Sequence, residues 1–248
     1  MNIISTPLFS IVTAVFNDRL GLQRTSECLA AQSYNNFEWI VIDGGSTDGT
    51  ANLLKTDTII KTWVSERDEG IADAWNKGIR LSLGLYIVLL NAGDTFDTNY
   101  LETMACYAAG DRIVCCHVRL ATESGCVIGT LKAEPDKLWR GMHLPHNWCV
   151  VPKRIYAEIG DYPKIRYSMD FAWFHQYYQR YGKSGFIVVP KILGTYRLGG
   201  QSDLGYRTVF KENVRILRQN GMGIVLGRLV SFAYTFKHWL VIRLRTHR

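Results

Sequence analysis

The first hundred residues alternate between short apolar runs and longer segments in which apolar residues recur at helical spacing. An apolar run of about four to eight residues is typical of a buried strand, whereas a repeat of about three to four positions favours a helix. The runs predict strands at residues 8–16, 37–43, 59–64 and 85–91, and helices between them at residues 17–32, 47–55 and 71–83. Because strands that alternate with helices form parallel sheets with right-handed crossovers, we expect an α/β fold with a mostly parallel sheet flanked by helices.

The second half of the chain has a less regular pattern. Residues 113–120 and 126–131 predict a hairpin, and helices are predicted at residues 153–159, 168–181 and 206–220, with a short strand beginning at Val188. No linker rich in Pro, Gly or Ser divides the chain before residue 200. We therefore expect one domain over residues 1–205 and a C-terminal helical extension over residues 206–248.

The charge of the chain changes how this extension is interpreted. The sequence has 29 Lys and Arg against 22 Asp and Glu, a net charge of +7, but no acidic residue follows Glu212 and seven basic residues do. The excess charge therefore belongs to the tail, which argues against a nucleic-acid-binding domain and favours contact with an anionic surface, either lipid headgroups or polyphosphate. The apolar residues of the tail, Trp239 among them, form no clean amphipathic stripe. A helix packed partly on the domain and partly on a membrane surface fits this pattern, and a helix packed only on its own domain or on a partner is the alternative.

Composition places the chain among folded proteins, with 47% hydrophobic and 21% charged residues over 248 positions. No apolar run approaches the ~18 residues of a spanning helix, and the N-terminal residues lack the features of a signal peptide. The six cysteines show no metal-ligand spacing, and the adjacent Cys115 and Cys116 would point to opposite faces of their strand. We expect reduced thiols in a cytoplasmic protein that is peripheral at the inner face of the membrane.

Two buried strands end in polar turns. Asp43 follows an apolar run and precedes Gly44 and Gly45, which let the backbone turn sharply. The strand ending near Asn91 leads into Asp94, a hard oxygen ligand suited to Mg²⁺ or Mn²⁺. Ligands of open α/β sheets bind at such strand ends, and we expect the two turns to be neighbours. An ordinary turn, with Asp94 capping the next helix, is the alternative. The first strand lacks the G-x-G-x-x-G turn of NAD-binding domains, which argues against that class.

Several blocks together resemble the family 2 glycosyltransferases, nucleotide-sugar-dependent enzymes with the GT-A fold, a Rossmann-like sheet. These blocks are WIVIDGGSTDGT at residues 39–50, SERDEGIADAWNKG at 65–78, NAGD at 91–94, GDY at 160–162 ahead of Asp170, and GGQS at 199–202. The resemblance implies that Asp170 is the catalytic base, that Asp94 binds Mg²⁺ or Mn²⁺ and that His146 lies near the acceptor, with a structural role as the alternative for His146. We expect Asn76 to brace a neighbouring loop rather than to touch substrate. The resemblance also implies a set of donor-binding residues: Thr13, Asp43, Ser46, Asp68, Asp73, Asn91, Gly200 and Ser202.

The chain departs from the family pattern at two positions, because Asn91 and Met169 stand where many members carry carboxylates. The resemblance still implies an inverting enzyme of surface-polysaccharide assembly, which moves a sugar from a UDP-, GDP- or dTDP-linked donor to a lipid-linked saccharide. The two missing carboxylates keep open an inactive nucleotide- or glycan-binding protein. Helix capping is the alternative role for Asp68 and Asp73 and for Asp170, and Ser168 is a second candidate cap for the helix that carries Asp170.

Overall fold

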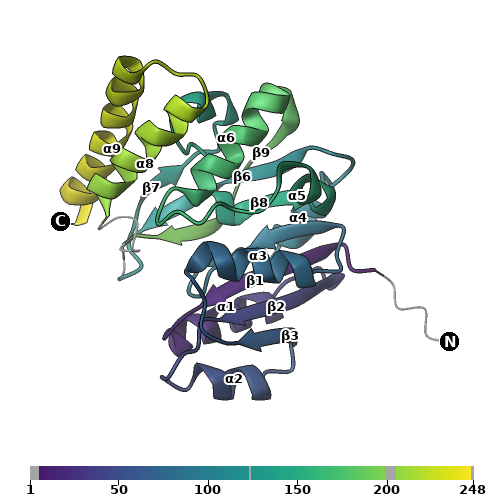
Figure 1. Ribbon diagram of the computed structural model, residues 1–248. Coiled ribbons are helices and arrows are strands. Elements are labelled where there is room, and N and C mark those ends of the chain that lie inside the picture. The colour runs from purple at the N-terminus through teal and green to yellow at the C-terminus, as the bar shows by residue number, and fades with distance from the viewer. Residues whose placement is uncertain (1–5, 123, 199–204, 247–248) are drawn as a thin grey trace.

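The computed structural model describes residues 6–122, 124–198 and 205–246, with side chains as far as Phe236 (Figure 1). Within these residues one sheet of nine strands has the order β3-β2-β1-β4-β8-β6-β9-β5, and β7 pairs with β6. The strands are β1 (Phe9–Val15), β2 (Phe37–Asp43), β3 (Ile60–Ser65), β4 (Tyr86–Leu89), β5 (Thr95–Phe96), β6 (Ile113–Ala121), β7 (Val127–Leu131), β8 (Cys149–Pro152) and β9 (Phe186–Arg197).

Helices cover both faces of the sheet, which is why the central strands are apolar at nearly every position. One face packs against α1 (Arg19–Ala30), α2 (Thr50–Thr56) and α4 (Tyr100–Ala105). The other packs against α3 (Ile71–Leu81), α5 (Lys153–Ile159) and α6 (Met169–Tyr181). Cys115 and Cys116 lie in opposite clusters, as expected, and all six cysteines are free.

Strands β3, β2, β1 and β4 are parallel, so their carboxyl ends share one edge of the sheet. β1 lies between β2 and β4, so the expectation that the Asp43 and Asn91 turns are direct neighbours is wrong. β8 runs antiparallel to β4. The residues that enter β8, a short 3-10 turn η2 (His146–Trp148), therefore lie at the same edge as the carboxyl end of β4.

The remaining helices, α8 (Tyr206–Gln219) and α9 (Ile224–Thr246), lie beside α6 in Figure 1. Ile216 and Leu217 of α8 form an apolar cluster with Phe171 of α6. α9 packs on α8 and on the 3-10 turn η1 (Pro135–Arg140), and the Tyr234 hydroxyl donates to the Met142 carbonyl at 2.8 Å. None of the helices in the described part of the chain combines the length and hydropathy needed to cross a membrane.

Candidate active site

The Asp43 turn is held by its own carboxylate. Asp43 is fully buried, and its oxygens accept hydrogen bonds from the Ser46 amide at 3.1 Å and the Ser65 hydroxyl at 2.6 Å. The Ser46 hydroxyl in turn accepts from the Asn17 amide at 2.7 Å. A side chain at Gly44 would place its Cβ 2.8 Å from Asp68 Oδ2. The turn therefore brings Ser46 and Asp68, both predicted donor ligands, to the same strand edge.

Two other predicted donor ligands are engaged by the fold. Thr13 is fully buried, and its hydroxyl accepts from the Trp39 indole at 2.9 Å inside the sheet. Asp73 contacts Lys77 at 3.1 Å and accepts from the Glu69 amide at 3.2 Å. Although partial burial opposes it, these two interactions hold the pKa of the Asp73 carboxyl below its ordinary value. Donor contacts by Thr13 and Asp73 stay predictions.

Asn76 braces a loop, as expected. Its amide nitrogen donates to the Tyr162 carbonyl and its oxygen accepts from the Tyr162 amide, both at 2.9 Å. These two bonds tie α3 to the loop that precedes α6. Gly200 and Ser202 lie outside the described residues, so their predicted donor contacts stay predictions as well.

Asp94 lies after β4 and contacts a residue that the sequence did not single out. The Asn147 amide nitrogen donates to Asp94 Oδ2 at 2.6 Å. Burial raises the pKa of the Asp94 carboxyl to about 7, and the Asn147 bond and nearby Arg197 only partly oppose this. The next helix, α4, begins after Asn99, so Asp94 does not cap it.

Asp170 lies in the first turn of α6, and its Oδ2 is 3.4 Å from His146 Nδ1. The two side chains are 20% and 16% exposed. Burial raises the pKa of Asp170 and lowers that of His146, although each group opposes the shift of the other. The His146 ring also meets the Trp75 ring edge-on at 5.1 Å between centroids, and the Trp75 indole donates to Asn91 Oδ1 at 3.1 Å.

Adjacent residues of η2 therefore contact the two carboxylates predicted to carry the chemistry. His146 meets Asp170 and Asn147 meets Asp94, while the Trp148 indole donates to the Thr95 carbonyl at 3.2 Å. Asn147 and Trp75 were absent from the residues predicted for the site. The one local signal for Asn147 was its place between His146 and a buried strand.

The oxygen atoms around Asp94 suit a hard divalent cation. Asn147 is 3% exposed, and its Oδ1 is buried without a hydrogen-bond partner. A carboxylate whose pKa is raised by burial gains most from a nearby positive charge, and Mg²⁺ and Mn²⁺ prefer oxygen ligands. Among the described residues no three His, Cys, Asp or Glu side chains gather as a metal site. Any ion at Asp94 would need further oxygens from water or a phosphate ligand.

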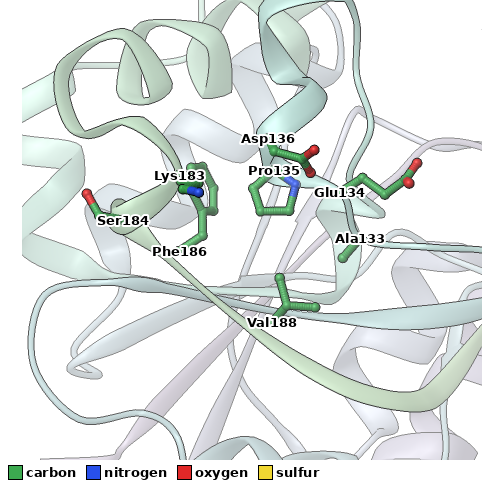
Figure 2. Close-up of a pocket in the computed structure, with 8 residues that line it drawn as sticks. All are labelled: Ala133, Glu134, Pro135, Asp136, Lys183, Ser184, Phe186 and Val188. Carbon is green, nitrogen blue, oxygen red and sulfur yellow. The ribbon is translucent and has the colours of Figure 1, made fainter.

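A hollow of about 540 Å³ lies away from this edge, between η1 and the 3-10 turn η3 (Gly182–Gly185) (Figure 2). None of the predicted site residues lines it. Its walls are Ala133, Glu134, Pro135, Asp136, Lys183, Ser184, Phe186 and Val188. The candidate site is therefore the shared strand edge, where the polar groups converge.

The family to which the chain belongs follows from comparison with known sequences. Residues 10–204 match the model of Glycosyl transferase family 2, so the chain belongs to that family. An uncharacterized glycosyltransferase of Mycobacterium tuberculosis is 43% identical over 94 residues, which cover 37% of this chain and 36% of that protein. TuaG of Bacillus subtilis, described as a candidate glycosyltransferase of teichuronic acid biosynthesis, is 33% identical over 100 residues, 39% of this chain and 40% of TuaG. The alignments thus span less than half the length of these relatives.

Solved structures with low sequence identity share the fold. Residues 1–349 of Staphylococcus aureus TarS with UDP-GlcNAc align with a TM-score of 0.64 at 13% identity, over 93% of this chain and 72% of that one. The mannosyltransferase PcManGT of Pyrobaculum calidifontis with GDP-Man and Mn²⁺ aligns with a TM-score of 0.68 at 14% identity, over 97% and 74%. The GT-A fold implied by the resemblance is confirmed.

Proposed function

We propose that the chain is an inverting glycosyltransferase that uses a nucleotide-diphosphate sugar and acts in surface-polysaccharide assembly. The observation that carries this proposal is the η2 turn. It holds a partly buried carboxylate suited to base catalysis, Asp170, and a partly buried carboxylate suited to a cation, Asp94, through the adjacent residues His146 and Asn147. Family membership and neighbours solved with UDP-GlcNAc or GDP-Man support a nucleotide-sugar donor.

Asp170 accepts the proton of an acceptor hydroxyl in this reaction. The oxygen then forms a bond to the anomeric carbon, on the face opposite the nucleotide, while the bond from that carbon to the diphosphate breaks and its electron pair leaves with the nucleoside diphosphate. Burial raises the pKa of Asp170, which makes its carboxylate a stronger base. The neighbouring His146 lies where it can orient that carboxylate toward the acceptor.

Asp94, which accepts a hydrogen bond from Asn147, is the proposed ligand of Mg²⁺ or Mn²⁺. When bound, such an ion would offset the charge that develops on the leaving diphosphate. The Asp43 turn, with Ser46 and Asp68, is the proposed contact for the nucleoside and donor sugar.

The proposed acceptor is a lipid-linked saccharide at the inner face of the cytoplasmic membrane, and α9 supports this. Its buried positions include Ser231 and Thr235, whereas the exposed side chains between Ile224 and Phe236 are apolar apart from Arg228. The exposed set comprises Ile224, Val225, Leu226, Leu229, Phe232 and Phe236, which are 43–69% exposed. A lipid surface would cover these side chains, and the basic tail suits anionic headgroups.

Replacement of Asp170 by Asn tests the reaction because it keeps the size of the side chain and removes the proton acceptor. We expect Asp170→Asn to lower kcat by ~10²-fold or more with donor affinity nearly intact. The donor is found first by thermal shift with UDP-, GDP- and dTDP-sugars and Mn²⁺, since a ligand that binds the folded state raises its stability. Asp161→Asn is the matched control, because Asp161 is an exposed carboxylate in the loop before α6 that pairs with Arg80 of α3.

Unchanged turnover in Asp170→Asn would overturn the role of the base. Loss of donor affinity together with turnover would place Asp170 in the donor site instead. Donor binding without turnover by the wild type would favour the inactive binding protein, which the replacement of carboxylates by Asn91 and Met169 motivates.

A further inference from the structure

Helix α8 begins beyond the region that carries most of the family motifs, yet it reaches the backbone next to Asp170. The Glu212 carboxylate accepts three backbone hydrogen bonds from consecutive residues: the amides of Arg166 at 3.1 Å, Tyr167 at 3.1 Å and Ser168 at 2.9 Å. We propose that Glu212 is the positioning residue of the catalytic base, so that α8 is a working part of the active site. This inference rests on the role proposed for Asp170.

A second contact from α8 reaches the other side of Asp170. Ile216 lies one helical turn after Glu212, on the same face of α8, and packs with Leu217 against Phe171. Glu212 thus fixes the chain before Asp170, and the apolar contact fixes the residue after it. Between them, the Asp170 side chain has a local hydrogen bond, from the Phe171 amide at 2.7 Å.

The start of α6 is not fixed by the side chain of Ser168, the candidate cap of this helix. Ser168 precedes the helix, but its side chain makes no capping hydrogen bond and its hydroxyl is buried without a partner. The capping role considered for Ser168 is therefore wrong. The Glu212 carboxylate instead accepts from the amides of the three residues that lead into α6, so a side chain from α8 fixes the start of this helix.

The charge of Glu212 also acts on the base. It raises the pKa of Asp170, in the same direction as burial, which is the larger cause, whereas His146 lowers it. The Tyr162 phenol is another titratable neighbour of Asp170. η1 also packs on α6, and its charged residues are Asp136, Lys137 and Arg140. Removal of the Glu212 charge should therefore let Asp170 lose its proton at lower pH.

Two variants of Glu212 distinguish the effect of its charge from the effect of its side-chain length. Glu212→Gln removes the charge and should shift the acid limb of the kcat/KM profile to lower pH while the plateau falls by about tenfold, the scale of a lost charged hydrogen bond. Glu212→Asp keeps the charge and shortens the side chain, so the plateau should fall with the acid limb in place. Aspartate-selective ¹³C titration, with the Asp170 signal assigned from Asp170→Asn, measures the same shift without any substrate.

Glu158→Gln is the matched control, because Glu158 pairs with Arg180 at 2.8 Å near the other end of α6. Glu158→Gln removes a carboxylate that contacts α6 from α5 and should leave the Asp170 pKa unchanged. An unchanged Asp170 pKa in Glu212→Gln would overturn the inference, as would an equal shift in Glu158→Gln. If Asp170→Asn retains full turnover, the role proposed for Asp170 is wrong. That result is distinguishable from a wrong role for Glu212, which is decided by the Asp170 pKa.

Discussion

At the scale of single residues, Asp94 has an ionisation that responds to pH near neutrality. Burial raises its pKa to about 7, and a bound cation requires the ionised carboxylate. Mn²⁺ should therefore bind more tightly at pH 8 than at pH 6, and Asp94→Asn should lose most of this binding. Titration of free Mn²⁺ by electron paramagnetic resonance measures both effects, with Asp161→Asn as the control. Equal affinity at the two pH values would remove Asp94 from the metal site.

The same shift predicts how stability depends on pH without metal. Because the pKa of Asp94 is raised in the folded state, its contribution to stability is present below the ordinary value of 3.8 and is lost as the pH rises through about 7. Asp94→Asn cannot ionise at this position, so its melting temperature should rise relative to that of the wild type as the pH increases from 5 to 8. Calorimetry at several pH values, in the presence of EDTA, tests this. A difference that does not vary with pH would contradict the burial of this charge.

Sequence patterns predicted the residues that sit in contiguous motifs better than those that act across the chain. Asp94, His146 and Asp170 converge in the structure, and the brace from Asn76 has the predicted form. Asn147 carries no motif of its own, and Glu212 meets residues 166–168 from 44 to 46 positions away. Contacts of that separation depend on how helices pack, which local patterns do not encode.

At the scale of elements, α3 approaches the sheet closely at Gly78. A Cβ there would lie 2.3 Å from Val12 Cγ1, and Val12 is fully buried in β1. Gly78→Ala should therefore lower the free energy of unfolding by about 1–2 kcal/mol, because overpacking outweighs the better helix propensity of Ala. Urea denaturation measures the change. Arg80→Ala, on the exposed side of α3, should change stability by less than about 0.5 kcal/mol. A stabilised Gly78→Ala would show that α3 can move away from β1.

Elements were predictable where their pattern is long and continuous. The strand expected at residues 37–43 is β2, and the helix expected at 153–159 is α5. β9 is much longer than its expected start at Val188 suggested, because Pro190 and Gly194 interrupt the apolar pattern while pairing with β6 and β5 continues. The two-residue β5 and the six-residue α4 are too short to produce a period, so the sequence did not predict them.

At the scale of the whole molecule, only the structure shows the order of the strands, because the pairing of β1 with both β2 and β4 produces no pattern in the local sequence. The division at residue 205 stays a prediction. α8 nevertheless packs on α6 and α9 packs on α8, so the extension is joined to the domain through a continuous set of contacts. Deletion of α9 would expose part of this packing, so substitution of exposed side chains on α9 is the better test of membrane contact.

We expect the outer face of α9 to bind vesicles that contain anionic lipid. The double variant Leu229→Ser with Phe232→Ser removes two apolar side chains, 62% and 59% exposed, and should lose most of the binding in a flotation assay. Leu83→Ser with Leu85→Ser alters side chains of similar exposure between α3 and β4 and should bind as the wild type does.

Charge should set the preference for anionic lipid. Arg207 and Lys211 line a groove of about 420 Å³ with Tyr206, Phe210, Phe232, Thr235 and Phe236. Arg207→Gln with Lys211→Gln should therefore weaken binding to anionic vesicles more than to neutral ones. Flotation of the Leu229 and Phe232 variant at the wild-type level would contradict the membrane proposal. If light scattering showed that the variant is a monomer and the wild type a dimer, the exposed face of α9 would instead be identified as a contact with a second copy of the chain.

The η2 turn constrains how such an enzyme can be engineered. His146 and Asn147 are consecutive, so a single peptide unit of about 3.8 Å separates the residue beside Asp170 from the residue beside Asp94. An inserted or deleted residue between Pro145 and Cys149 would break the link to one carboxylate or the other. Libraries that seek new acceptors should therefore keep the length of this turn fixed, so that Asp94 and Asp170 stay at their present separation.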